Sequence, residues 1–370
     1  MILGAIAPNN KGDKRTTLHP ESIKPILDMG IEIIFESGLC QGIDTSDEEM
    51  SKIGAKALTR EECLKTSDLL FTSTSITTEE IHLMKKGSTL LGLLEPFSNK
   101  EQFNYFIKQE ISAISMEFMP RITRAQKMDV LSSQSNLAGY VAVIESAKNL
   151  NSALPMMMTA AGTLRPASVF VIGVGVAGLQ AIATAKRLGA KVEAFDTRAI
   201  VEEQVKSLGA KFVKLDIGDT GQTEQGYAKE LTEEQVKKQK ALQKDVCRRS
   251  DIVITTAQIF GKSAPRIIDL DTIKMMKPGS VIFDMAVESG GNVEGSKLDS
   301  VEIINGVKVI GHSNLPSFVA NHASLSLSNN LINFVLDFYD SENKVMNLNM
   351  EDEIIRSALI VNNGKMVKEF

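Results

Sequence analysis

Six consecutive residues of the chain have the spacing of a turn that binds a pyrophosphate. Gly173, Gly175 and Gly178 stand in the run GVGVAG, which follows the apolar segment SVFVIG and precedes a helical segment of small residues. The first glycine permits a tight turn, the second lets the backbone approach a pyrophosphate, and the third allows close packing of helix and strand. The free N–H groups of the helix N-terminus add attraction for phosphate. The pattern predicts a dinucleotide-binding fold, with Val176 and Ala177 inside the turn.

An acidic residue follows the glycine run at the sequence spacing expected for a contact with the adenosine ribose of a dinucleotide. Asp196 comes 18 residues after Gly178, at the end of the apolar segment KVEAF. Because a carboxylate accepts both ribose hydroxyls and repels a 2′-phosphate, Asp196 favours NAD over NADP. Thr197 and Arg198 follow directly, and Arg198 is close enough to complicate this choice. The alternative is a strand–helix turn whose glycines serve packing alone.

A second group of candidate residues lies in the polar segment PRITRAQKMDVLSSQS, at residues 120–135. An arginine here could meet a phosphate, while glutamine, aspartate and serine could hold an amide such as the nicotinamide carboxamide. The segment separates two predicted domains, and clefts between domains are common ligand sites. The candidates are Arg121, Gln126, Asp129 and Ser132. The alternative is a solvated loop that caps the following helix, with serine as the N-cap.

A third candidate is the segment GDTGQTEQGYAKEL at residues 218–231, where three glycines accompany a single aromatic residue, Tyr227. Small polar residues and glycines of this kind permit a mobile flap that closes over a ligand, and Gly226 and Tyr227 are its candidate binding residues. The alternative is a plain surface loop.

Composition and charge exclude several classes of protein. The chain has 370 residues, with 41 Lys and Arg against 46 Asp and Glu, so its net charge of −5 argues against a nucleic-acid partner bound through a basic face. No apolar run approaches the ~18–20 residues of a membrane-spanning helix, and the start has no secretory signal pattern. The three cysteines and four histidines show no metal-ligand spacing, so no metal site is predicted. Taken alone, these features indicate a soluble protein of cytosolic type.

The elements that must position these residues alternate between strand and helix. Buried strands are expected at residues 1–8, 31–36, 68–72, 89–94, 168–173, 191–195, 211–215, 251–256, 280–285 and 307–311. Helical segments separate most of them. This alternation predicts an α/β fold made of two Rossmann-like, doubly wound parallel-sheet domains joined by long helices.

The boundaries of the two domains follow from two predicted long helices. Residues 1–132 and 318–370 are expected to form a discontinuous, flavodoxin-like N-terminal domain, and residues 133–317 the NAD(H)-binding domain. A helix at 136–150 would lead into the second domain, and a helix with an apolar stripe would cross back to the first. The stripe consists of Leu327, Leu331, Phe334, Val335 and Phe338.

Two shorter segments also carry a structural expectation. The tail SALIVNNGKMVKEF has the pattern of a hairpin, with Asn363 and Gly364 in the turn. The methionines at 156–158 are interpreted as core, because methionine is a flexible filler of apolar interiors.

Beyond these local patterns, the sequence closely resembles the soluble NAD(H)-binding α subunit of the proton-translocating NAD(P) transhydrogenases, in the alanine dehydrogenase/transhydrogenase family. The resemblance extends over the chain to about Leu336. Its most specific stretches are PRITRAQKMDVLSSQSNLAGY, MMMTAAGTLRPASVFVIGVGVAGLQAIATAKRLGA, GYAKEL and MKPGSVIFDMAVESGGN.

The resemblance implies a role for each residue of the polar segment. Arg121, Asp129 and Ser132 would hold the nicotinamide of NAD(H) and its neighbouring phosphates. Gln126 would reach toward NADP(H) bound to a partner subunit.

The resemblance also implies contacts at the other end of the dinucleotide. Val176 and Asp196 would contact the adenosine half, and Tyr227 would close over the cofactor. Residues 255–257, which include Thr256 and Ala257, would form a wall of the same site at the carboxyl end of a strand.

The reaction implied is direct hydride transfer between NADH on this chain and NADP+ on an NADP(H)-binding component. Such chemistry requires no acid or base from the protein, which supplies orientation and excludes water. A membrane-spanning proton-channel component would couple the transfer to proton translocation. The resemblance further implies a homodimer, formed through the nucleotide-binding domain, on the cytoplasmic or matrix side and peripheral to the inner membrane through its partner subunits.

Two alternatives remain at this point. Alanine dehydrogenase shares the fold but needs a lysine and a histidine around the substrate carbonyl. The corresponding segments, DLLFTSTSIT and LLGLLEPFSN, contain neither, although Arg15 matches the arginine that binds the amino-acid carboxylate. A non-catalytic NAD-binding protein is the other alternative, and the intact polar segment argues against it.

Overall fold

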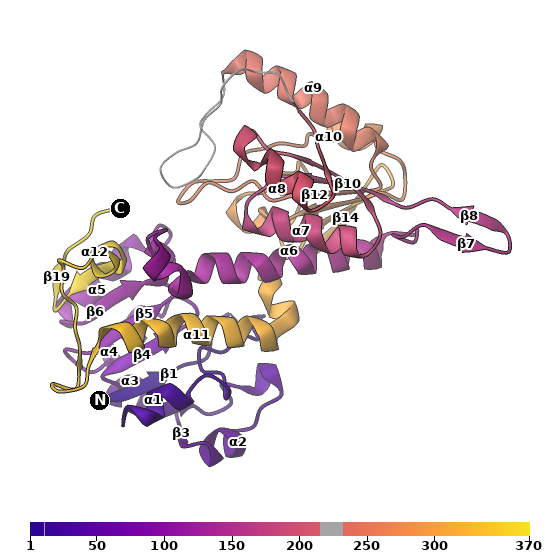
Figure 1. Cartoon of the computed structure of the whole chain (residues 1–370). Coiled ribbons are helices and arrows are strands. Elements are labelled where there is room, and N and C mark those ends of the chain that lie inside the picture. Colours follow the sequence, from indigo (N-terminus) through magenta and orange to yellow (C-terminus); the bar gives the residue numbers. More distant parts are fainter. Residues whose placement is uncertain (11, 215–231) are drawn as a thin grey trace. The chain divides into compact units, whose positions relative to one another are not determined.

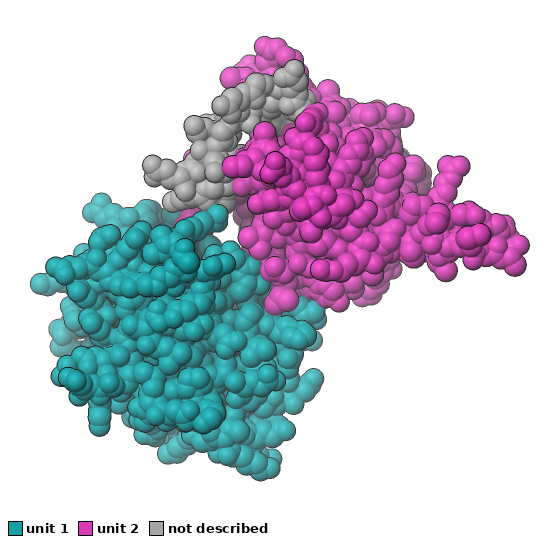
Figure 2. Space-filling model, in the orientation of Figure 1, with its two compact units in different colours: residues 1–134, 316–370 teal, residues 135–315 magenta. Residues whose placement is uncertain are grey.

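The computed structural model describes residues 1–10, 12–214 and 232–370 of the chain. These residues form two compact units, which Figure 2 colours separately: unit 1 contains residues 1–134 and 316–370, and unit 2 contains residues 135–315. Each unit is built around one mostly parallel sheet, in agreement with the alternation of strands and helices in the sequence (Figure 1). The chain passes from unit 1 to unit 2 within one helix, α6 (Val130–Asn149).

The sheet of unit 1 has eight strands in the order β19-β18-β6-β5-β4-β1-β2-β3. Its parallel strands are β1 (Ile2–Ala5), β2 (Glu32–Glu36), β3 (Ala55–Leu58), β4 (Leu69–Thr72), β5 (Thr89–Gly92) and β6 (Ser112–Ser115). Numbered among themselves, these six strands have the order 3-2-1-4-5-6 of dinucleotide-binding folds. Flavodoxin-like sheets have the order 2-1-3-4-5, and this sheet differs from that order by the additional edge strand β3. Strand β3 is half-exposed and has no clear apolar pattern.

Helices cover both faces of this sheet. One face packs against the apolar sides of α1 (Lys24–Asp28), α2 (Asp47–Lys52), α11 (Ala320–Phe338) and α12 (Glu353–Ala358). The other face packs against α3 (Arg60–Thr66), α4 (Thr78–Leu83) and α5 (Phe103–Lys108). The apolar stripe predicted for α11 is buried at all five of its positions.

Local sequence explains where several of these helices begin. Ser46, Thr59 and Thr77 each stand at an N-cap, and each accepts a hydrogen bond from the backbone of a glutamate three residues later. The glutamate side chain in turn accepts from the N-cap backbone. These capping boxes satisfy N–H groups that the first helical turn leaves without partners.

The tail forms the predicted hairpin and completes the sheet of unit 1. Strand β18 (Leu359–Asn362) pairs antiparallel with β19 (Lys365–Met366), and β18 also pairs antiparallel with β6. The turn residues Asn363 and Gly364 both have positive φ, 43° and 76°, as a two-residue hairpin turn requires.

Unit 2 contains a seven-stranded sheet in the order β11-β10-β9-β12-β13-β15-β14. Its strands are β9 (Ser168–Ile172), β10 (Lys191–Phe195), β11 (Lys211–Phe212), β12 (Ile252–Thr255), β13 (Val281–Asp284), β14 (Ser300–Ile304) and β15 (Val307–Gly311). All pairs are parallel except β14 with β15. The six parallel strands again have the order 3-2-1-4-5-6, so the order reverses between β9 and β12. Ligands of such sheets bind outside the carboxyl ends of the strands at this reversal.

The helices of unit 2 are α7 (Val176–Arg187), α8 (Glu202–Ser207), α9 (Glu233–Arg249) and α10 (Leu270–Met275), together with most of α6. The buried side chains of α9 and α10 share one apolar core with β9, β12, β13 and β15. Gly139 lets α6 approach α7 closely, because a Cβ atom there would lie 2.1 Å from the carbonyl oxygen of Ala177.

A short hairpin of unit 2 contradicts one expectation. Strands β7 (Met157–Thr159) and β8 (Gly162–Leu164) pair antiparallel and extend away from the body of the unit (Figure 1). The side chains of Met156, Met157 and Met158 are 63%, 45% and 85% exposed, so their assignment to the core is wrong. An apolar run by itself does not tell a core strand from an exposed hairpin.

Candidate functional site

The turn between β9 and α7 has the geometry that its three glycines predict. Gly173 has φ of 98°, and a Cβ atom there would lie 2.5 Å from Oγ1 of Thr256. A Cβ atom at Gly178 would lie 1.9 Å from the carbonyl oxygen of Gly173, whereas one at Gly175 would meet nothing within 4 Å. The outer glycines are therefore required by the packing of the turn. The middle one borders open space, as expected where a phosphate approaches the backbone.

Helix α7 begins directly at this turn. Its N-cap is Gly175, which forms no side-chain cap hydrogen bond. Val176 and Ala177 are predicted inside the turn, but they form the first residues of the helix, and Val176 is 40% exposed. A 12-residue helix with an open first turn presents N–H groups and a positive dipole end to an anion. Because this N-terminus follows β9, it lies where the strand order of the sheet reverses.

Asp196 lies immediately after β10, and both of its carboxylate oxygens accept hydrogen bonds. Oδ2 accepts from the backbone N–H of Val174 at 2.7 Å and from Nη2 of Arg198 at 2.8 Å. Oδ1 accepts from the backbone N–H and from Nε of Arg198, at 2.8 and 2.9 Å. These hydrogen bonds raise the pKa of the Arg198 guanidinium. Asp196 thus ties the glycine turn to the residues after β10, and Thr197 stands between the two members of the pair.

The predicted wall at residues 255–257 follows β12, next to the glycine turn. Oγ1 of Thr256 donates to the carbonyl oxygen of Gly173 at 3.0 Å. The side chain of Asn292 brackets Ala257, because its Oδ1 accepts from the Ala257 N–H at 3.1 Å and its Nδ2 donates to the Ala257 carbonyl at 2.8 Å. The carboxylate of Asp284 accepts from the Asn292 N–H at 3.1 Å. This network holds the wall in place.

Sequence reasoning missed three residues that shape this half of the site. Asn292 and Asp284 are fully buried and support the wall, and Gly139 brings α6 against the first turn of α7. Both stand in the stretch SVIFDMAVESGGN: Asp284 is the last residue of the buried strand β13, and Asn292 follows that strand. Polar residues at the carboxyl end of an apolar strand are a usable signal, because ligands bind at that edge of the sheet. Gly226 and Tyr227, the candidate flap residues, lie outside the described residues.

The candidate residues of the polar segment belong to unit 1. Arg121 and Gln126 are exposed, while Asp129 and Ser132 are half-buried. Residues Thr123–Met128 form a 3₁₀ helix, and α6 begins at Val130 rather than at residue 136 as expected. The helix begins earlier than expected because the side chain of Asp129 caps its N-terminus.

Both carboxylate oxygens of Asp129 contact Ser132. Its Oδ1 accepts from the backbone N–H of Ser132 at 2.9 Å, and its Oδ2 accepts from the Ser132 hydroxyl at 2.6 Å. An aspartate three residues ahead of the N–H that it binds acts as an N-cap. The alternative of a capping loop is thus correct in part, with aspartate rather than serine as the cap. Capping also holds Asp129 and Ser132 in one arrangement, since each side chain restricts the other.

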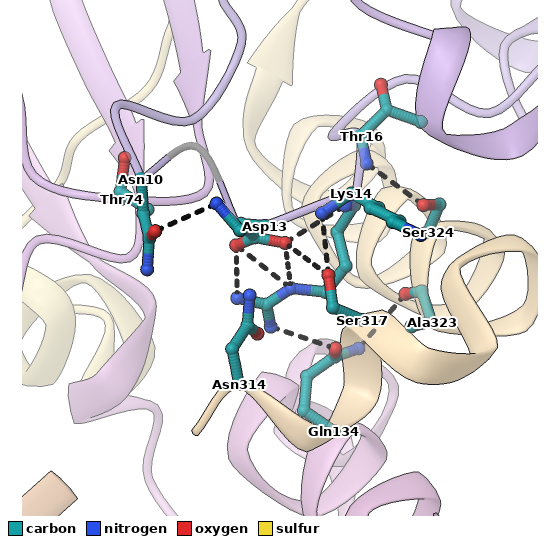
Figure 3. Close-up of polar contacts among 12 residues, drawn as sticks. Asn10, Asp13, Lys14, Thr16, Thr74, Gln134, Asn314, Ser317, Ala323 and Ser324 are labelled. Atoms are coloured by element: carbon teal, nitrogen blue, oxygen red, sulfur yellow. Dashed lines mark hydrogen bonds and ion pairs between the residues drawn. The ribbon is translucent and has the colours of Figure 1, made fainter. Parts of the chain in front are cut away.

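The guanidinium group of Arg15 is hydrogen-bonded to side chains of unit 1. Its Nε and Nη2 donate to the carboxylate of Asp13, with a shortest distance of 2.7 Å, and its Nη1 donates to Oε1 of Gln134 at 3.1 Å. Nε2 of Gln134 reaches the carbonyl oxygen of Ala323 in α11, and Ser317 lies beside Asp13 and Lys14 (Figure 3). The side chains of Arg15 and Asp13 are only 10% and 2% exposed. The guanidinium is therefore a structural cation in this fold.

The cysteine thiols do not provide a nucleophile. Burial raises the pKa of the Cys40 thiol to about 11, and that of the Cys63 and Cys247 thiols to about 12. All three thiols are therefore protonated at neutral pH. Among the described residues, no group of three or more His, Cys, Asp or Glu side chains is arranged to hold a metal ion.

The described part of the chain contains no helix that is long and apolar enough to cross a membrane.

The two doubly wound sheets, with a glycine turn and an acidic residue at the reversal of strand order in unit 2, define a two-domain protein of the Rossmann nucleotide-binding class. Comparison with protein families agrees. The N-terminal domain of the alanine dehydrogenase/PNT family matches residues 6–138, and the C-terminal domain of that family matches residues 142–369. The chain belongs to this family.

Individual relatives narrow the position of the chain within the family. It is 45% identical to the first part of NAD(P) transhydrogenase subunit alpha of Rhodospirillum rubrum, over 96% of this chain and 95% of the relative. It is 37% identical to NAD(P) transhydrogenase subunit alpha of Haemophilus influenzae, over 99% of this chain and 72% of the relative. Alanine dehydrogenase 1 of Staphylococcus aureus is more distant, at 26% identity over 92% of this chain and 88% of the relative.

Comparison with solved structures also relates the chain to transhydrogenases and alanine dehydrogenases. A transhydrogenase from Sinorhizobium meliloti superposes with a TM-score of 0.90 and 40% identity, covering 99% of this chain and 100% of the other. An L-alanine dehydrogenase superposes with a TM-score of 0.81 at 20% identity, covering 99% of this chain and 97% of the other, which shows a shared fold. The predicted family and the two Rossmann-like domains are confirmed.

Proposed function

We propose that this chain is the NAD(H)-binding component of a proton-translocating transhydrogenase and takes part in direct hydride transfer between NADH and NADP+ on a partner subunit. The observation that carries the proposal is the turn between β9 and α7. Gly175 leaves open space beside a helix N-terminus without a side-chain cap, and Asp196 stands at the end of the next strand. Relatives named as transhydrogenase α subunits, at up to 45% identity, support the same function.

In this proposal, unit 2 is the NAD(H)-binding domain and holds the adenosine half and the pyrophosphate. The backbone from Gly173 to Gly178, with Val176 and Ala177, binds the phosphates through N–H groups. Asp196 accepts the ribose hydroxyls, in place of part of its contact with Arg198. Thr197, Arg198, Thr256 and Ala257 border the same end of the site.

The polar segment of unit 1 is proposed to hold the nicotinamide end. Arg121 pairs with the neighbouring phosphates, Asp129 and Ser132 orient the nicotinamide, and Gln126 reaches toward the NADP(H) of the partner. The bound nucleotides supply the hydride donor and the hydride acceptor. The protein supplies orientation and excludes water, and no side chain is required to move a proton.

The proposal includes partners that this chain does not contain. They are an NADP(H)-binding component and a membrane-spanning proton-channel component, which would hold the chain at the cytoplasmic or matrix side of the inner membrane. We also propose a homodimer formed through unit 2. The exposed methionines of the β7–β8 hairpin support this, because contiguous exposed apolar side chains commonly mark an interface.

The decisive experiment mixes the purified chain with a purified NADP(H)-binding component and follows hydride exchange between NADH and an NADP analogue. Exchange that depends on both proteins would support the proposal. NADH binding without exchange would favour the alternative of a non-catalytic NAD-binding protein.

A parallel assay tests the alanine dehydrogenase alternative. Incubation with alanine and NAD+ should yield no NADH, because the segments at 68–77 and 90–99 lack the lysine and histidine and because Arg15 is engaged by Asp13. Robust NADH formation with alanine would overturn the assignment.

A further inference from the structure

Three side chains on one face of helix α11 contact Lys127, in the polar segment of unit 1. Asn330, Asn333 and Asp337 have the spacing that places them on the same side of a helix. Nδ2 of Asn330 and Nδ2 of Asn333 donate to the carbonyl oxygen of Lys127, at 2.8 and 3.2 Å. The ammonium group of Lys127 pairs with Asp337 at 2.5 Å.

Asn330 differs from its two neighbours because it contacts the segment at a second point. Its Oδ1 accepts a hydrogen bond from the hydroxyl of Ser133 at 2.7 Å. One carboxamide therefore joins the Lys127 carbonyl to the Ser133 hydroxyl. The residues enclosed between these two points include Asp129 and Ser132, which hold each other through the cap of α6.

The burial of Asn330 makes this attachment specific. The residue is 7% exposed and stands beside Leu327, Leu331 and Phe334 in the apolar stripe of α11. Leaving a buried carboxamide without hydrogen-bond partners costs free energy. The Nδ2 and Oδ1 atoms of Asn330 therefore favour the arrangement of the segment in which both are hydrogen-bonded. Asn330 is thus a buried polar residue next to the apolar stripe, and its hydrogen-bond partners lie in the polar segment.

We infer that Asn330 is a positioning residue for hydride transfer: it holds the turn from Lys127 to Ser133 so that Asp129 and Ser132 present one fixed geometry to the nicotinamide. The inference rests on the proposed function for its kinetic consequence, but not for its structural one. Asn330 touches no cofactor in this scheme and acts through the segment that it holds. Displacements of about 1 Å in the positioning of a reacting group reduce rates by about a hundredfold.

The structural part is tested by backbone hydrogen–deuterium exchange on the purified chain. In Asn330→Ala, amide protection across residues 127–134 should fall at least about tenfold, while protection in the strands of unit 1 stays unchanged, since local opening is governed by local contacts. Asn329→Ala is the matched control, because Asn329 is the exposed neighbour on the same helix. Equal protection of residues 127–134 in Asn330→Ala and wild type would overturn the inference.

The kinetic part uses hydride exchange with the NADP(H)-binding component at saturating NADH. Asn330→Ala should lower the rate at least about tenfold while changing the dissociation constant of NADH by less than about threefold, because orientation rather than binding is lost. Asn329→Ala should exchange at the wild-type rate. A wild-type rate in Asn330→Ala, or a loss explained by weaker NADH binding alone, would contradict the inference.

Two further variants keep the test informative if Asn330→Ala does not fold. Ser133→Ala removes one of the two contacts and should give a smaller loss of protection and of rate than Asn330→Ala. Asn330→Asp keeps an acceptor for Ser133 but turns a carboxylate oxygen toward the Lys127 carbonyl oxygen, which repels it, so its loss should be at least as large as that of Asn330→Ala. A wild-type result in both variants would overturn the inference. If the wild-type chain exchanges no hydride at all, the proposed function fails, and the protection experiment still decides whether Asn330 holds the segment.

Discussion

The guanidinium group of Arg198 lies against the carboxylate of Asp196 at the end of β10, and the two side chains are only 16% and 7% exposed. Asp196 is the residue predicted to select NAD over NADP by repelling a 2′-phosphate. Because Arg198 neutralises this carboxylate, the structure offers a weaker barrier to a 2′-phosphate than the aspartate alone would.

This pair predicts how Arg198 affects the choice of nucleotide. Arg198→Ala should raise the ratio of the NADPH to the NADH dissociation constant about tenfold, because the freed carboxylate repels a 2′-phosphate and accepts ribose hydroxyls. Titration of each nucleotide by fluorescence or calorimetry measures the ratio. Arg187→Ala, at an exposed arginine of α7, is the control. An unchanged ratio in Arg198→Ala would show that the pair does not influence selectivity.

The polar segment predicts a loss of hydride exchange without a loss of fold. Asp129→Ala and Gln126→Ala should each slow exchange about a hundredfold, the usual effect of removing one preorganised polar group from a reacting site. Asp129→Asn retains an oxygen that can cap α6, so it separates loss of charge from loss of the cap. Circular dichroism checks the fold. If both alanine variants exchange at the wild-type rate, the assignment of this segment is wrong.

The ion pair between Arg15 and Asp13 predicts a large effect on stability. Arg15→Ala should lower the free energy of unfolding by about 3–5 kcal/mol, because it removes the guanidinium that neutralises a carboxylate only 2% exposed. Urea denaturation measures the change. The control is Lys24→Ala, which breaks a pair whose members are 80% and 63% exposed and should have little effect. Similar stability losses in the two variants would contradict a structural role for Arg15.

Buried His19 predicts that stability falls in mild acid. Desolvation lowers the pKa of His19, which is 1% exposed, and its Nδ1 accepts a hydrogen bond from the Glu21 N–H, which requires the unprotonated ring nitrogen. The unfolded chain takes up a proton near the ordinary pKa of 6.5, whereas the folded chain does so only at lower pH. The unfolding free energy should therefore decrease as the pH falls below 6.5, by up to about 1.4 kcal/mol per pH unit.

The measurement for His19 is urea denaturation of wild type and His19→Gln between about pH 5 and pH 8, the range around the ordinary histidine pKa. The variant cannot titrate at this position, so its stability should fall less steeply below the ordinary pKa. Parallel pH profiles for the two proteins would show that His19 does not contribute.

The exposed hairpin of unit 2 predicts the oligomeric state. Met158 is 85% exposed, and Met158→Asp should convert a homodimer into a monomer at micromolar concentration, because a charge would be buried at an apolar interface. Sedimentation velocity measures the change. Met275→Asp, at a methionine 45% exposed elsewhere in unit 2, is the control. A wild-type monomer under these conditions would contradict the proposed homodimer itself.

Local patterns were sufficient for most of the fold. The strand, glycine turn and helix at residues 168–187 could be predicted because each depends on neighbours within a few positions along the chain. The tail hairpin could be predicted because Asn363 and Gly364 favour positive φ. Edge strands such as β3 and β14 were not predicted. Their side chains are only partly buried, so their sequences lack the apolar runs of the central strands.

Some features of the candidate site could likewise be predicted from local sequence, and others could not. The sequence by itself determined the glycine turn, the acidic residue after β10 and the composition of the polar segment, because turn conformation and residue chemistry are local properties. Only the tertiary structure decided that Asn330 joins Lys127 to Ser133, since Asn330 lies about 200 positions along the chain from both of them. It also decided that Gln134, 119 positions along the chain from Arg15, accepts a hydrogen bond from its guanidinium, and that the methionines of the β7–β8 hairpin face solvent. Contacts between distant segments depend on how helices pack on sheets, and no pattern within one segment encodes them.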